Sequence, residues 1–196
     1  MYRPATKLRD GVAGNARLTG AAAAALLVLL AAEGATIPFI GQLLGPHIFI
    51  GMLLIPPVLL KLGSTGYRFV RYYTGSPRYV EKGPPHLVLR VLAPGVVLST
   101  LALFGTGVAL LVDGPPSNTL LFAHKASFIA WVSLMTLHVL GHLLEVPSLA
   151  GADWRKAGPP EARLAGAGAR ALTLATAILA GAVLAALTFS TARPWF

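Results

Sequence analysis

The sequence contains no cysteine among its 196 residues. Disulfides, iron–sulfur clusters and thiolate-bound metals or haem are therefore excluded, because each of these needs a cysteine sulfur. Any redox cofactor of this protein must be held by other side chains, and histidine is the common alternative ligand.

Charged residues are also scarce, at 12% of the chain, whereas 55% of the residues are hydrophobic. The mean hydropathy of +0.69 is far from that of a soluble domain, so the composition predicts an integral membrane protein. Acidic residues are the rarest charged type, with 7 Asp and Glu against 16 Lys and Arg, which gives a net charge of +9. The Lys and Arg residues lie where membrane topology places them, in the loops on one side of the membrane. We therefore expect no nucleic-acid partner.

Five apolar stretches are long enough to cross a bilayer as helices, which takes about 20 residues each. They predict an all-α integral membrane bundle that forms a single membrane domain over residues 1–196. The second stretch contains Pro56 and Pro57, where we expect a kink. A basic start and an Ala/Leu-rich core make a cleaved signal peptide the alternative for the first stretch. The expected spans are 18–40, 45–67, 86–112, 119–145 and 169–191.

The distribution of basic residues orients this bundle. The short loops after the first and third spans contain no Lys or Arg. The positive-inside rule then predicts a multi-pass protein of the plasma (inner) membrane, with the N-terminus in the cytoplasm and the C-terminus outside. The bases lie before the first span and after the second and fourth, at Arg3, Lys7, Arg9, Arg17, Arg68, Arg71, Arg78, Lys82, Arg155, Lys156 and Arg163.

Three histidines lie on the fourth predicted span, at His124, His138 and His142. Histidine inside a membrane span is costly and usually marks a site. The fourteen-residue step from His124 to His138 leaves the two rings roughly 40° apart on one helix face, with a rise of roughly 21 Å. One helix can therefore supply a ligand to each of two stacked cofactors. His142, one turn beyond His138, is the alternative at the lower position.

The other two histidines lie at the same membrane depths as the histidines of the fourth span. His47 opens the second span at the outer side, level with His124. His86 opens the third span at the cytoplasmic side, where His138 and His142 lie. Two histidine pairs from antiparallel helices would hold two planar macrocycles in a four-helix haem-binding core, one near each membrane face. Zinc would instead want about four ligands at one point, and a histidine proton relay would leave the two-plus-two pattern unexplained.

These histidines resemble those of the cytochrome b subunits of membrane formate dehydrogenases and nickel–iron hydrogenases, and of a related group of small actinobacterial-type cytochrome b proteins. The likeness covers the second to fourth spans. It implies two low-spin b-type haems, each bound by two histidines, that carry electrons between a quinone pool and a peripheral redox subunit. By this resemblance His47 and His124 would hold the outer haem, and His86 and His138 the inner haem.

The sequence departs from that family in two places. A further span precedes the ligand helices, and Lys61 stands fourteen residues after His47, where broader respiratory cytochromes b have a second histidine. The inner ligand also stays open between His138 and His142, because counting along the third span places His86 nearer the depth of His142.

Several other residues are candidates for supporting the cofactors. Gly51 follows His47 by one turn and would let a macrocycle approach, although glycine is equally common where membrane helices touch. Lys61, Arg68 and Arg90 would meet haem propionates on the cytoplasmic side. Snorkelling of these side chains to the lipid headgroups is the alternative.

Two charged residues belong to the outer half of the predicted bundle. Lys125 is a further candidate for a propionate contact at the outer haem. Glu33 interrupts the first span, where it would pair with Lys125 or take part in proton transfer.

The sequence thus predicts a transmembrane electron carrier that is a subunit of an oxidoreductase complex. Membrane lipid would surround it, quinone and a peripheral redox subunit would be its partners, and quinone would be a further ligand beside two b-type haems. One alternative is a single-haem quinone or ferric-type reductase module that uses His47 and His124 alone. The other is a haem-free transporter or assembly protein whose histidines relay protons or metal ions.

Overall fold

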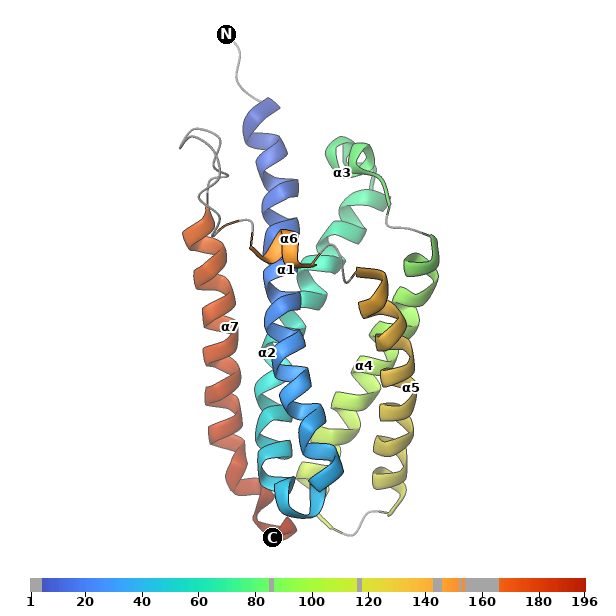
Figure 1. Ribbon diagram of the computed structural model, residues 1–196, viewed down its shortest axis with the longest axis vertical. Helices are drawn as coiled ribbons and strands as arrows, with labels where there is room; N and C mark the ends of the chain where they lie inside the picture. Colours follow the sequence, from blue (N-terminus) through green and yellow to red (C-terminus); the bar gives the residue numbers. More distant parts are fainter. Residues whose placement is uncertain (1–4, 85–86, 116–117, 143–145, 152, 154–165) are drawn as a thin grey trace.

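The computed structural model describes residues 5–84, 87–115, 118–142, 146–151, 153 and 166–196. These residues form helices and no strand, so the all-α prediction is confirmed. Five long helices run along the length of the molecule (Figure 1), namely α1 (Ala5–Thr36), α2 (Ile40–Tyr73), α4 (Leu87–Asp113), α5 (Asn118–His142) and α7 (Ala167–Thr188). The shorter helices are η1 (Ile37–Phe39), α3 (Pro77–Lys82), α6 (Val146–Ala150) and η3 (Phe189–Trp195).

Four segments of the described chain are long and apolar enough to cross a membrane. The first of them contains both α1 and α2, which run in opposite directions on either side of η1 (Figure 1). The chain is therefore a helical membrane protein in a lipid environment. The four segments are Gly11–Tyr73, Leu87–Asp113, Asn118–His142 and Ala167–Trp195.

The long helices form two packed groups that α2 and α4 join. In one group α2 packs against α1 and α7, and in the other α4 packs against α5 (Figure 1). Glycines permit the closest approaches. A Cβ atom on Gly181 of α7 would overlap the carbonyl oxygen of Leu53 on α2, and one on Gly141 of α5 would lie 2.7 Å from Cδ2 of Leu89 on α4. Small residues let membrane helices approach in this way.

An apolar core lies at the end of the bundle that contains the C-terminus. It is centred on Met52, Leu111, Ala185 and Ala192, from α2, α4, α7 and η3. The residues of α2 that follow His47 pack against this core. The part of α2 that follows His47 is thereby fixed to α4, α7 and η3.

Helix α2 has irregular backbone at Leu43, whereas the sequence predicts a kink at Pro56 and Pro57. Leu43 is the residue of α2 with non-helical backbone angles, φ −110° and ψ 21°. Pro46 lies three residues further on, and a proline ring disturbs the preceding helical turn. The helix keeps its regular backbone through Pro56 and the fully buried Pro57, as membrane helices often do. The irregular backbone therefore comes immediately before His47.

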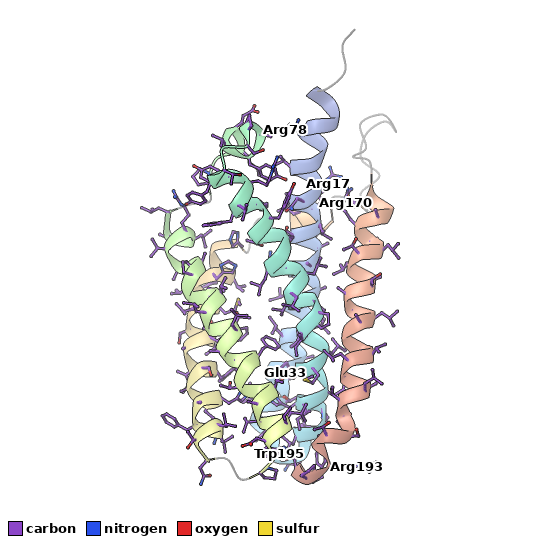
Figure 2. All side chains as sticks on the ribbon, turned by 180° about the vertical axis from the view of Figure 1, so that it is seen from behind. Arg17, Glu33, Arg78, Arg170, Arg193 and Trp195 are labelled. Atoms are coloured by element: carbon purple, nitrogen blue, oxygen red, sulfur yellow. The ribbon has the colours of Figure 1, made fainter. Side chains whose placement is uncertain are left out.

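Basic side chains gather at the end of the bundle opposite the C-terminus, which we call the basic end. Figure 2 shows Arg17, Arg78 and Arg170 there, with Glu33 well separated from them. Asp153 joins α1 to α7 at this end, because its Oδ1 accepts from Arg17 Nη1 at 2.8 Å and its Oδ2 accepts from Arg170 Nε at 2.5 Å. The hydrogen bonds from Arg170, reinforced by Arg17, hold the pKa of the Asp153 carboxyl below its usual value against the opposing effect of partial burial.

Candidate functional site

His47 of α2 and His124 of α5 come together in the half of the bundle nearer the C-terminus. Their ring centroids are 6.4 Å apart and their ring planes are inclined by 82°. Helix α5 makes most of its close backbone contacts with α4. The two imidazoles therefore meet across a pair of helices that do not pack closely on each other.

The spacing of these rings matches two imidazoles bound to opposite sides of one metal ion. A bond from a metal ion to an imidazole nitrogen is about 2.0–2.1 Å long, and the nitrogen lies about 1.1 Å from the ring centroid, so opposed rings have centroids roughly 6.3 Å apart. The observed separation of 6.4 Å agrees with that value. The backbones of α2 and α5 thus already hold these side chains at the spacing of a bis-histidine pair.

His47 makes its side-chain hydrogen bonds through Nδ1. Thr36 Oγ1 lies 2.9 Å and Glu33 Oε1 3.0 Å from this nitrogen. The Thr36 hydroxyl donates its own hydrogen to the Glu33 carbonyl at 2.6 Å, so its oxygen is left to accept from His47 Nδ1–H. The lone pair of His47 is then on Nε2. That tautomer is the one in which an imidazole binds a metal while its other nitrogen donates a hydrogen bond.

His124 has the same arrangement with a neutral partner. Thr106 Oγ1, on α4, lies 3.1 Å from His124 Nδ1. The Thr106 hydroxyl donates to the Ala102 carbonyl at 2.7 Å, one turn earlier on α4. Thr106 therefore accepts from Nδ1–H, which leaves a lone pair on His124 Nε2. The neighbouring Gly107 makes room for the ring, since a Cβ atom there would lie 3.2 Å from His124 Cε1.

His138 and His142 lie one turn apart on α5, toward the basic end. Their ring centroids are 4.8 Å apart and their planes are inclined by 61°. This separation is shorter than the roughly 6.3 Å of opposed ligands, and both rings project from one side of one helix. They cannot bind opposite faces of one macrocycle, so only one of them can pair with a ligand from another helix. His86, the expected partner, lies outside the described residues.

The environment of His138 contains an unsatisfied nitrogen. Its Nδ1 is buried and has no hydrogen-bond partner in the part of the chain that the structure describes. Buried polar atoms of this kind are nearly always paired. Lys61 is close enough for its charge to act on the ring, but its Nζ donates to the Thr19 carbonyl at 3.1 Å. Within the described residues, His138 Nδ1 thus lacks the hydrogen-bond partner that Nδ1 of His47 and of His124 each has.

The other predicted residues make contacts that the sequence does not predict. Gly51 faces α1, and a Cβ atom there would lie 3.5 Å from Glu33 Oε1. Arg90 Nη2 donates to the Tyr73 hydroxyl at 2.8 Å. Glu33, for which Lys125 was one expected partner, pairs instead with His47.

Glu33, Thr36 and Thr106 complete the outer site, and their contacts with the histidines could not be read from the sequence. Each is a polar residue in or beside an apolar helix, and this is the only feature of the sequence that points to them. Hydroxyl side chains in membrane helices usually bond to their own backbone, as Thr106 also does. The hydrogen bonds to the histidines appear only when the helices are packed.

Comparisons with protein-family models, with curated proteins and with solved structures find no match to this chain. The geometry of the histidines and of their hydrogen-bond partners is therefore the evidence on function.

The donor set of the outer site fits a haem better than a bare metal ion. Among the described residues, no three His, Asp or Glu side chains converge closely enough to hold a metal ion, whereas zinc prefers four ligands in a tetrahedron. A haem needs only one or two further iron ligands from the protein. His47 and His124 would hold it through their Nε2 lone pairs.

Proposed function

We propose that this protein transfers electrons across the membrane and that histidine-bound b-type haems are the carriers. The observation that carries this proposal is the His47–His124 pair, whose ring centroids are 6.4 Å apart and whose Nδ1 atoms are both occupied by hydrogen bonds. When bound, a haem supplies a one-electron couple. Because two histidines would hold the group, electron transfer is favoured over catalysis at the metal.

The residues that would hold the haems follow from these positions. His47 and His124 would bind the outer haem, and His86 with His138 or His142 would bind the inner haem. The inner ligand stays open between His138 and His142. Fourteen residues separate the two sites along α5, a rise of roughly 21 Å, so the haems would lie at different depths in the membrane.

The proposed orientation places the basic end in the cytoplasm, by the positive-inside rule. The N-terminus would then be cytoplasmic, and the C-terminus and the outer haem site would face the other side of the plasma (inner) membrane. In this arrangement the protein is the electron-transfer subunit of an oxidoreductase complex, with quinone at one end of the electron path and a peripheral redox subunit at the other.

A single-haem reductase module is the second candidate function. It is favoured by the fact that, within the described residues, only His47 and His124 have the spacing of an opposed ligand pair. In that case His138 and His142 would handle protons or support the fold.

The test is the reduced-minus-oxidised absorption spectrum of the purified protein, produced with haem supplied, together with a pyridine haemochrome count per chain. Two low-spin b-type haems support the di-haem carrier, and one supports the single-haem module. We expect His47→Ala and His124→Ala each to remove the same haem, and the double variant to remove no more. Wild-type protein without haem would overturn the electron-transfer proposal and leave a proton or metal relay as the better explanation.

A further inference from the structure

We propose that one corner of the basic end binds the headgroup of an anionic phospholipid, and that Arg68, Arg71 and Arg78 hold its phosphate. The corner, residues 67–82, consists of the end of α2, the turn that follows it and helix α3; we call it the α2–α3 corner. The inference goes beyond the proposed function, and it does not depend on a bound haem.

Positive charge at the α2–α3 corner has no internal counter-charge. Between residues 67 and 91 the sequence has a single acidic residue, Glu81, against the basic residues Arg68, Arg71, Arg78, Lys82 and Arg90. Within the described residues, none of the three arginines of the corner pairs with a carboxylate. Arg17 and Arg170 at the same end differ, because they share Asp153. The α2–α3 corner is therefore a part of the basic end that can accept an external anion.

The turn after α2 folds the chain back so that α3 lies against α2. Gly75 makes this turn with φ 74°, a left-handed conformation that glycine adopts easily. The Ser76 amide then donates to the Arg71 carbonyl at 3.0 Å. Nη2 of Arg71 donates to Ser76 Oγ at 3.1 Å. The guanidinium of Arg71 is thus held at the start of α3.

Tyr79 fixes α3 in this position. Its side chain is buried, and its ring centroid lies 5.9 Å from that of Tyr67 on α2. Burial raises the pKa of the Tyr79 hydroxyl, and Arg68 and Arg71 are near enough for their charges to oppose this rise. These two arginines of α2 therefore lie beside the short helix that carries Arg78. Figure 2 shows Arg78 at the same end of the bundle as the paired arginines.

Exposed aromatic side chains indicate that these arginines lie at a membrane surface. Phe69 is 62% and Tyr73 56% exposed, and their ring centroids are 4.5 Å apart. Aromatic residues are enriched at the membrane–water interface, and arginines at that level extend to the headgroups. A guanidinium presents a planar fork of donors that matches a phosphate. An anionic phospholipid supplies both the phosphate and the apolar surroundings that this corner requires.

The experiment is native mass spectrometry of the full-length protein, released from nanodiscs with equal amounts of phosphatidylglycerol and phosphatidylcholine. Both lipids have a phosphate diester, but only phosphatidylglycerol has a net negative charge. We expect the wild-type protein to retain phosphatidylglycerol in excess. An arginine near an anionic surface contributes about fivefold in affinity, so the Arg71→Gln, Arg78→Gln double variant should lower the ratio of the two bound lipids on the order of tenfold.

Two further variants separate the loss of charge from a change of fold. Arg78→Gln alone leaves the hydrogen bond between Arg71 and Ser76 intact and should lower the ratio about fivefold. The Arg71→Lys, Arg78→Lys double variant keeps both charges and should keep most of the preference. Arg193→Gln is the matched control, because Arg193 is exposed at the opposite end of the bundle (Figure 2) and its loss should leave the ratio unchanged.

Three results would overturn the proposal. Equal retention of the two lipids by the wild-type protein would make an acidic partner protein the better occupant of the α2–α3 corner. The same preference in the wild-type protein and in the glutamine double variant would show that these arginines do not select the lipid. An equal fall in Arg193→Gln would show that net charge, and not this corner, decides which lipid is retained.

Discussion

Thr106 on α4 and His124 on α5 are joined side chain to side chain, with 3.1 Å between Oγ1 and Nδ1. The contact ties the orientation of the His124 ring to the packing of α4 on α5. Trp131 strengthens the same helix pair, because its Nε1 donates to the Thr100 hydroxyl at 3.1 Å. Helix α4 thus supports the proposed haem site although neither His47 nor His124 lies on it.

Removal of the Thr106 hydroxyl should therefore weaken haem binding at the outer site. Thr106→Val leaves His124 Nδ1 without an acceptor, and changes to such partners of a ligand typically cost 10- to 100-fold in metal affinity. We expect a loss of roughly tenfold, measured as outer-haem occupancy during titration of the purified protein with haem. Thr106→Ser keeps the hydroxyl and should bind as wild type does. Equal affinity in the valine and serine variants would show that this hydrogen bond does not matter.

The choice between His138 and His142 can be decided by two parallel substitutions. Because the two rings cannot oppose each other across one macrocycle, at most one of them serves as a ligand. We expect His138→Ala, like His86→Ala, to lose the inner haem, and His142→Ala to keep both haems. The haem count per chain measures the outcome. Loss of a haem in His142→Ala, with both retained in His138→Ala, would identify His142 as the ligand.

The ion pairs of Asp153 should make stability depend on pH. Because the folded protein lowers the pKa of this carboxyl below 3.8, its contribution is present at neutral pH and is lost as the pH falls through the lowered pKa. We expect Asp153→Asn to reduce stability at neutral pH by on the order of 1 kcal/mol, since partial exposure screens such pairs. Thermal unfolding in detergent at several pH values provides the measurement. A difference that persists undiminished at the acidic limit would contradict this explanation.

The contact between α7 and α2 leaves no space for a side chain at Gly181. A Cβ atom there would overlap the Leu53 carbonyl oxygen, and overpacking of this kind costs about 1–3 kcal/mol. Gly181→Ala should therefore lower the unfolding temperature. Gly168→Ala, in the same helix, is the control, because nothing lies within 4 Å of its added Cβ and alanine favours the helix. Similar unfolding temperatures for both variants would show that α7 can shift without cost.

The long helices could be predicted because an apolar run of membrane length has few alternatives to a helix in a bilayer. The proximity of His47 and His124 could also be anticipated, since depth in the membrane follows from distance to the nearest span end. Glu33 could not be assigned to His47 in this way, because the contact depends on how α1 and α2 are rotated about their axes. The irregular backbone at Leu43 could not be predicted either. Pro46, Pro56 and Pro57 are all prolines within an apolar stretch, and only Pro46 is accompanied by irregular backbone.

The separation of the outer histidines along the chain has a consequence for biogenesis. His47 and its partners Glu33 and Thr36 all belong to the α1–α2 hairpin, which is synthesised before α5. His124 emerges only after α4 has been made. The α1–α2 part of the proposed haem site is therefore made before the α5 part that carries His124. Stable haem insertion at this site would follow the synthesis of α5.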